Sequence, residues 1–285
     1  MRAWLAAGSV LAYLAIGYLA AARLSSPVRH PVERTPAQVG LDYMKVAVRS
    51  SDGLSLSAWW VAREGSSRAA VLVHGWGGDR SDPHVIRTAL VYHGAGFNVL
   101  MLDLRAHGGS EGGRVTAGYR EPRDARGALA WLEERGFDPR DVVLHGWSLG
   151  GAAVLRAAPH TGVAAVVEEA GYADLPPLLR ELLPKVSGLP AFFVPAILLM
   201  GRFLLGIDYR AVRPVEGARQ LYTEGVPVMI IHSRDDAVIP FGHAEALAAA
   251  HPAATFWEIK GYAHVAAYAN PGYKTRLLSF LGETA

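Results

Sequence analysis

The 285-residue sequence contains no cysteine. This absence excludes disulfide bonds, cysteine nucleophiles and thiolate metal sites, although it leaves the cellular compartment open. The net charge is only +2 and no cationic run is present, so nothing favours a nucleic-acid partner. Histidines and carboxylates lack the spacing typical of zinc sites, and we expect neither a metal nor a cofactor. Internal repeats are also absent, and the length is typical of one α/β domain.

Charged residues are missing from one long stretch, residues 3–22, which two arginines bracket. As a helix this stretch would span about 30 Å, the thickness of the hydrocarbon core of a bilayer. Trp4 and Tyr18 stand near its two ends, where aromatic side chains prefer the membrane interfaces. We therefore predict a membrane anchor over residues 1–24. A cleaved signal peptide and a buried helix of the globular domain are the alternatives.

These alternatives lead to different locations for the protein. The anchor predicts a single-pass membrane protein, whereas cleavage of a signal peptide would give a secreted one. Arg23, Arg29 and Arg34 follow the apolar stretch and outnumber the positive charges before it, which favours a cytoplasmic domain. The sequence does not determine the oligomeric state.

Beyond a predicted linker at residues 25–40, residues 41–285 alternate between strand-like and helix-like segments. This alternation predicts an α/β fold with a mostly parallel sheet flanked by helices. Strands are expected at residues 43–48, 54–61, 69–73, 97–102, 141–144, 163–167, 226–231 and 255–259. Helices are expected near residues 83–93, 121–134, 151–158, 243–250 and 273–281.

A longer segment at about residues 175–215 interrupts the alternation. Its residues 189–200 are strongly apolar but contain two prolines, which predicts a small helical lid over the site. A core helix and a surface that touches lipid are the alternatives. Such a lid would favour apolar acyl or alkyl groups, and we expect Phe192 and Phe193 to bind substrate. Trp147 is expected to bind substrate with them, unless it packs as a core aromatic.

Residues 146–150, Gly-Trp-Ser-Leu-Gly, stand between a predicted strand and a predicted helix. A serine on such a sharp turn has a strained backbone and an exposed hydroxyl, which suits a nucleophile. Glycines flank it because the strand and the helix approach too closely for a Cβ. The pattern alone is a modest signal, so Ser148 needs support from the rest of the chain.

A serine hydroxyl needs a histidine as base and a carboxylate to orient that histidine. Asp236 follows the strand predicted at residues 226–231, and His264 follows the strand predicted at residues 255–259. Both are therefore expected at the sheet edge that carries Ser148, where ligands bind in open α/β sheets. Asp235 is the alternative to Asp236 as the acid.

Further motifs accompany the serine turn: His-Gly-Trp-Gly-Gly at 74–78, an Asp-to-Ser segment at 103–110, and the segments 236–240 and 261–264. With these motifs, residues 43 to 283 resemble the α/β-hydrolase superfamily, and within it the membrane-anchored serine hydrolases that are BEM46-like or prolyl-oligopeptidase-like esterases. The resemblance implies an α/β-hydrolase fold with Ser148 as nucleophile, Asp236 as acid and His264 as base. It also implies an oxyanion hole formed by the backbone N–H groups of Trp76 and Leu149.

The expected function is a serine hydrolase that cleaves carboxylic ester or thioester bonds through an acyl-enzyme on Ser148. Its substrate would be a small-molecule ester or a lipid-like compound with an apolar acyl group. A peptidase or amidase with the same three residues is one alternative, disfavoured because no propeller precedes the domain. A catalytically idle, membrane-bound interaction module is the other, and the intact motifs speak against it.

Overall fold

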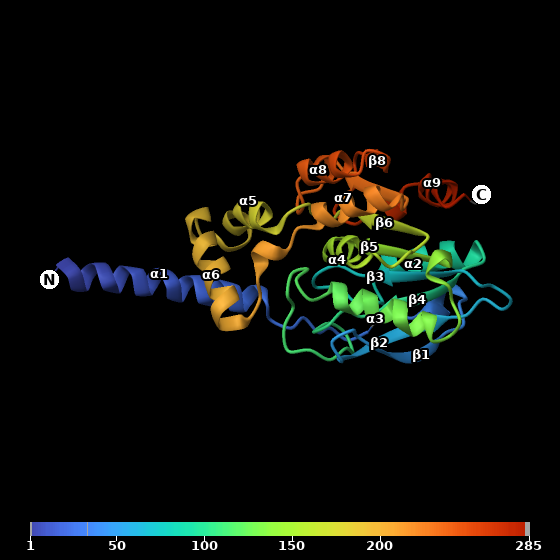
Figure 1. Ribbon diagram of the computed structural model, residues 1–285, viewed down its shortest axis with the longest axis horizontal. Helices are drawn as coiled ribbons and strands as arrows, with labels where there is room; N and C mark the ends of the chain where they lie inside the picture. Colours follow the sequence, from blue (N-terminus) through green and yellow to red (C-terminus); the bar gives the residue numbers. More distant parts are fainter. Residues whose placement is uncertain (1, 33, 283–285) are drawn as a thin grey trace.

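The computed structural model describes residues 2–32 and 34–282, which fold around one eight-stranded sheet (Figure 1). Its strands are β1 (Met44–Arg49), β2 (Ser55–Val61), β3 (Ala69–Val73), β4 (Asn98–Leu102), β5 (Val142–Trp147), β6 (Ala165–Glu169), β7 (Val228–Ser233) and β8 (Thr255–Ile259). The order across the sheet is β1-β2-β4-β3-β5-β6-β7-β8. Strand β2 pairs antiparallel with β1 and β4, and all later pairs are parallel. The predicted mostly parallel sheet is confirmed.

The centre of the sheet is apolar on both faces. Every residue of β3 and β5 is buried, because helices cover these strands above and below. Such strands read as continuous apolar runs in the sequence, which is why they were predictable. Strand β5 extends to Trp147, beyond the expected end at residue 144.

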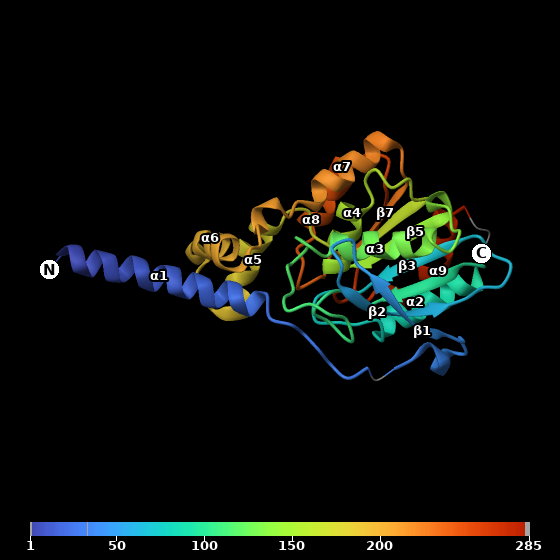
Figure 2. The same cartoon turned by 60° about the horizontal axis from the view of Figure 1, so that its bottom comes forward.

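Helices cover both faces of the sheet, as predicted (Figures 1 and 2). They are α2 (Pro83–Gly94), α3 (Pro122–Glu133), α4 (Leu149–Ala157), α7 (Pro214–Glu224), α8 (Gly242–Ala250) and α9 (Tyr273–Phe280). One apolar cluster joins α3, α4, α7 and α8 to the sheet, and another joins α2 and α9 to its opposite face. Helix α7 is not among the helices expected from the sequence. It packs against α4 through Gly217, where a Cβ would overlap the carbonyl of Leu155.

The segment predicted as a lid forms helices α5 (Leu175–Ser187) and α6 (Val194–Leu205), with short 3-10 turns at Ala191–Phe193 and Tyr209–Ala211. We refer to these four elements as the cap. The cap stands beyond one end of the sheet, beside the N-terminal helix α1 (Arg2–Leu24) (Figures 1 and 2). Its buried apolar residues form a third cluster that is shared with α1.

Helix α1 is largely exposed, and its segment Trp4–Leu24 is long and apolar enough to cross a membrane. A signal sequence meets the same criterion. The only other candidate among the described residues is a broken pair, Ala191–Leu205 with Tyr209–Glu224, bent by 108°.

The linker predicted at residues 25–40 is hydrogen-bonded to the surface of the α/β domain. The Val28 amide donates to the Ala106 carbonyl at 3.0 Å. The Arg29 guanidinium donates to the carbonyls of Gly108, Ser110 and Gly112, at 3.1, 2.6 and 3.1 Å. The chain that leaves α1 is therefore fixed to the loop after β4.

Candidate active site

Ser148 occupies the turn between β5 and α4, with φ 52° and ψ −114°. A positive φ is uncommon for a residue with a side chain and marks backbone strain. The neighbours must be glycine, because a Cβ on Gly146 would overlap the Gly150 carbonyl and one on Gly150 would overlap that of Val73. The Ser148 amide donates to the Glu169 carbonyl at 2.8 Å. This turn presents the partly exposed Ser148 side chain at the carboxyl end of β5.

Asp236 and His264 form a hydrogen-bonded pair. Their Oδ2 and Nδ1 atoms are 2.7 Å apart, and the Asp236 side chain is fully buried. Its Oδ1 accepts hydrogen bonds from the amides of Val238 at 2.8 Å and Ile239 at 2.9 Å. Burial raises the pKa of Asp236, but these bonds outweigh it and hold the pKa below its ordinary value. The carboxylate is therefore charged and holds the imidazole in a fixed orientation.

The neighbouring carboxyl, Asp235, is engaged elsewhere. Its Oδ2 accepts a hydrogen bond from the Gly261 amide at 2.6 Å, which ties the loop after β7 to the loop after β8. Of the two adjacent aspartates, Asp236 is thus the one that contacts His264.

Ser148, Asp236 and His264 follow β5, β7 and β8, which lie on one side of the parallel sheet with only β6 among them. Their loops therefore meet at one edge. Within the described residues Ser148 Oγ has no hydrogen-bond partner, so the structure pairs Asp236 with His264 and leaves Ser148 without such a bond. Catalytic hydrogen bonds are often long in the absence of substrate.

The two amides expected to bind an oxyanion make no hydrogen bond within the described residues. Neither the Trp76 nor the Leu149 N–H donates to an acceptor within the described residues, and Leu149 is the first residue of α4. Gly75 packs on the serine, since its Cβ would lie 3.2 Å from the Ser148 Cβ. Trp76 itself is 56% exposed.

Two buried histidines support the loop after β3. His74 Nε2 accepts from the Leu104 amide at 3.0 Å, and His107 Nε2 accepts from the Gly77 amide at 3.3 Å. Burial lowers the pKa of each to about 4, so both rings are neutral. They position the glycine-rich loop and are not themselves placed to act on a substrate.

The three residues expected to bind substrate make other contacts in the structure, and their role in substrate binding stays a prediction. Trp147 is completely buried and stacks on His145 with ring centroids 4.1 Å apart, so it packs in the core. Phe192 and Phe193 stack on Tyr13 of α1, with centroids 5.7 and 5.3 Å apart. Their partner lies 179 and 180 positions earlier in the sequence, which no local pattern indicates.

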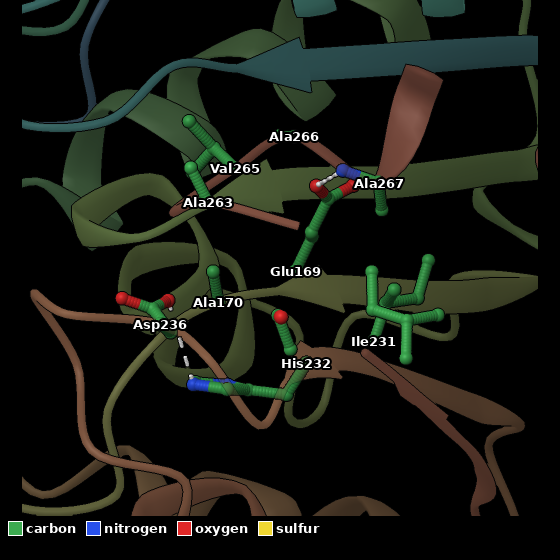
Figure 3. Close-up of a pocket in the computed structure, with 11 residues that line it drawn as sticks. Glu169, Ala170, Ile231, His232, Asp236, Ala263, Val265, Ala266 and Ala267 are labelled. Atoms are coloured by element: carbon green, nitrogen blue, oxygen red, sulfur yellow. Dashed lines mark hydrogen bonds and ion pairs between the residues drawn. The ribbon is translucent and has the colours of Figure 1, made fainter. Parts of the chain in front are cut away.

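Glu168 and Glu169, at the end of β6, form a buried acidic pair beneath the site. Glu169 Oε1 accepts from the Ala267 amide at 3.2 Å, and Oε2 accepts from Trp147 Nε1 at 2.9 Å. Burial raises the pKa of Glu168 to about 8 and that of Glu169 to about 7. Figure 3 shows the Glu169 carboxylate directly beside Ala267, with Asp236 on the other side of a small pocket. Glu169 thus links the serine turn to the histidine loop.

The cap approaches this site through contacts that the sequence did not indicate. The apolar cluster of the cap includes Ala152, one turn beyond Ser148, and Ile239, three residues beyond Asp236. The cap cluster thereby includes a residue of the helix after Ser148 and a residue of the Asp236 loop. Among the described residues, no three His, Asp or Glu side chains are grouped to hold a metal ion.

Comparison with known proteins agrees with this geometry. A profile described as the alpha/beta hydrolase family matches residues 70–273. The chain is 31% identical over 208 residues to the uncharacterized protein Rv2307c of Mycobacterium tuberculosis, covering 72% of this chain and 66% of that protein. It is 28% identical over 248 residues to the lysophosphatidylserine lipase ABHD12 of Macaca fascicularis, covering 79% and 59%. The chain thus spans less than two thirds of the length of either relative.

Solved structures with the same fold include the esterase Pf2001 of Pyrococcus furiosus, with a TM-score of 0.73 and 21% identity, covering 90% of this chain and 98% of that one. Est1E of Butyrivibrio proteoclasticus, solved with ferulic acid, has a TM-score of 0.64 and 16% identity, covering 84% and 100%. At these identities the likeness concerns the fold alone.

Proposed function

The chain belongs to the alpha/beta hydrolase family, and on this premise we propose that it is a serine hydrolase that cleaves carboxylic esters or thioesters with apolar acyl groups. The observation that carries the proposal is the 2.7 Å pair of His264 and Asp236, at the sheet edge that also carries the strained Ser148. Backbone strain and buried carboxylates are costly, and they cluster at functional sites in proteins.

The proposed mechanism begins with attack of Ser148 Oγ on the substrate carbonyl. His264 Nε2 takes the hydroxyl proton and then gives it to the leaving alcohol or thiol, which leaves an acyl-enzyme. Water activated by His264 releases the acid and restores the serine. Asp236, fixed by two backbone amides, keeps Nδ1 of His264 protonated and stabilises the imidazolium that forms.

The negative charge on the carbonyl oxygen is proposed to bind the amides of Trp76 and Leu149. Both N–H groups lack an acceptor in the described residues, and Leu149 begins a helix whose dipole favours an anion. His107 supports the first donor through the Gly77 amide. The donors are therefore held in place before the reaction begins.

The preference for apolar acyl groups rests on the cap, whose apolar cluster reaches Ala152 and Ile239 beside the site. A lipase among the relatives supports the same class of substrate. We also propose that α1 anchors the protein in a membrane, with a cleaved signal sequence as the alternative. The apolar exposed surface of α1 supports the anchor, because Trp4, Leu5 and Leu11 are 83%, 66% and 68% exposed.

Labelling with a fluorophosphonate probe tests the enzyme proposal. The full-length protein is expected to react, Ser148→Ala to lose labelling, and Ser51→Ala to keep it, since Ser51 is an exposed turn serine. Absence of labelling, or labelling that survives Ser148→Ala, would refute the proposal and favour an interaction module. A series of p-nitrophenyl esters run beside aminoacyl amides separates esterase from amidase. Equal turnover of amides would favour the peptidase.

A further inference from the structure

The two halves of α1 have different surroundings. In the first half, Val10 and Leu11 are 57% and 68% exposed, and every α1 residue that belongs to the cap cluster or packs against it lies at position 13 or later. In the second half, Tyr13 stacks on the two phenylalanines before α6, and its hydroxyl donates to the Phe192 carbonyl at 2.7 Å. Gly17 lies so close to Ala196 that a Cβ on it would overlap that residue. Helix α6 is therefore paired with the second half of α1 only.

The length of α1 then fixes the depth of α6. Residues 3–12 form a helical stretch of about 15 Å, half of the roughly 30 Å hydrocarbon core of a bilayer. The unpaired half of α1 can therefore cross only one leaflet. The second half must occupy the other leaflet if α1 spans the membrane, and α6 must lie there with it.

The surface of α6 is suited to lipid. Residues 194–201 carry no charge, and the outward side chains of Leu199, Phe203 and Leu204 are 39%, 70% and 62% exposed. The one charged residue of α6, Arg202, pairs with Asp208 at 3.3 Å near the end of the helix. Close packing through small residues such as Gly17 is also typical of helices that associate in membranes.

Helix α5 marks where the lipid contact ends. Arg180, Glu181 and Lys185 are exposed on α5, whereas Leu178, Leu179 and Leu183 pack into the cap cluster. Charged side chains are costly in the hydrocarbon core, so a helix with exposed charges such as α5 lies outside it. The charges of α5 thus place the polar boundary of the membrane between α6 and the catalytic domain.

We infer that α6 is embedded in the leaflet nearest the catalytic domain, and that the cap is a membrane-docking face whose occupant is the lipid bilayer. Because the cap cluster borders the loops of Ser148 and Asp236, an acyl chain reaches the site directly from that leaflet. This inference rests on the proposed anchoring by α1 and deepens the proposed function, since it makes bilayer-resident amphiphiles the substrate class.

The absence of cysteine makes a direct test simple. Leu204→Cys, Leu11→Cys and Leu90→Cys in the full chain each give one labelling site, in α6, α1 and the domain helix α2. Each variant is labelled with an environment-sensitive fluorophore in phosphatidylcholine vesicles and exposed to lipid-borne and aqueous quenchers. The Leu204 and Leu11 probes are expected to respond to the lipid quencher, and the Leu90 probe to the aqueous one.

The outcomes separate the proposals. A Leu204 probe that behaves like the Leu90 probe, while the Leu11 probe is in lipid, overturns the embedding of α6 and leaves the anchor. Leu204 and Leu11 probes that are both in water overturn the anchor and this inference together. Fluorophosphonate labelling of the same samples reports the serine hydrolase separately, because depth does not depend on catalysis.

Activity provides a second measurement. The double change Phe203→Asp and Leu204→Asp is expected to lower hydrolysis of a long-chain fluorogenic ester in vesicles by about tenfold, because charged side chains oppose insertion. Turnover of soluble p-nitrophenyl acetate should stay unchanged, which shows that the variant is folded. Leu90→Asp is the matched control and should change neither rate. Unchanged vesicle hydrolysis in the double variant would contradict the docking face.

Discussion

Gly75 lies directly against Ser148, since a Cβ on the glycine would stand 3.2 Å from the serine Cβ. That separation is shorter than ordinary van der Waals contact, so an added methyl group would displace the nucleophile or the Trp76 amide beside it. A misplacement of this kind affects the transition state more than the overall fold. Gly75→Ala is thus expected to lower kcat for an ester by about tenfold or more, which corresponds to 1.4 kcal/mol. Steady-state kinetics and thermal unfolding provide the measurement.

Gly94→Ala is the matched control, because a Cβ at Gly94 meets nothing within 4 Å. It should leave both kcat and Tm nearly unchanged. Wild-type kcat in Gly75→Ala would contradict the placement of the glycine-rich loop against the nucleophile.

The two adjacent aspartates are expected to respond differently to loss of charge. Asp236→Asn keeps an oxygen for the backbone amides but removes the charge that faces His264, so kcat/KM should fall by about 10³–10⁴. Asp235→Asn keeps an acceptor for the Gly261 amide and should change kcat/KM by only a few-fold. Kinetics of both variants on one ester decide the assignment, and equal losses would contradict it.

The pKa of Glu168 predicts a pH-dependent stability. Burial raises this pKa from 4.5 to about 8, so the folded state favours the neutral carboxyl. The neutral Glu168 side chain therefore contributes to the free energy of unfolding fully below pH 4.5, and this contribution is lost as the pH rises through about 8. The glutamine in Glu168→Gln does not titrate. The free energy of unfolding of this variant, relative to that of wild type, should therefore rise between pH 5 and pH 9 by on the order of 3 kcal/mol.

Denaturant unfolding at pH 5, 7 and 9 measures this difference. Glu134→Gln, a change at an exposed carboxyl, is the control and should run parallel to wild type. A Glu168→Gln curve that is also parallel to wild type would show that the buried carboxyl does not titrate in this range.

Trp147→Phe tests the assignment of Trp147 to the core. The change removes the donor to Glu169 and part of the stacking on His145, which should destabilise the protein by about 1–3 kcal/mol. KM for long-chain esters should not change, whereas Trp76→Ala, at an exposed side chain, should raise it. A change of KM in Trp147→Phe without loss of stability would instead indicate that Trp147 binds substrate.

The sheet was predictable from the sequence because strands such as β3, buried on both faces, are continuous apolar runs. The end of β5 was not, because His145 is polar yet buried, with Nδ1 3.2 Å from the Tyr92 hydroxyl oxygen. Chain order and strand ends predicted Ser148, Asp236 and His264 at one edge, and their catalytic roles stay predictions.

The contacts of Phe192 and Phe193 could not be predicted from the sequence for a physical reason. An apolar side chain in a cap packs against whichever apolar surface lies nearest, and that surface is set by tertiary structure. Phe193 contacts Tyr13, and neither the distance along the chain nor the local pattern indicates this. The buried Glu168–Glu169 pair had a visible signal, two acids at the end of an apolar strand, but its partners came only with the fold.

The bonds of Val28 and Arg29 to the loop after β4 fix the segment that follows α1 to the α/β domain, so this segment is not a flexible tether. With α1 in a bilayer, these bonds restrict rotation of the domain relative to α1, so the same side of the domain always faces the lipid. An enzyme held in this way encounters substrate in its own membrane far more often than substrate in separate vesicles or micelles.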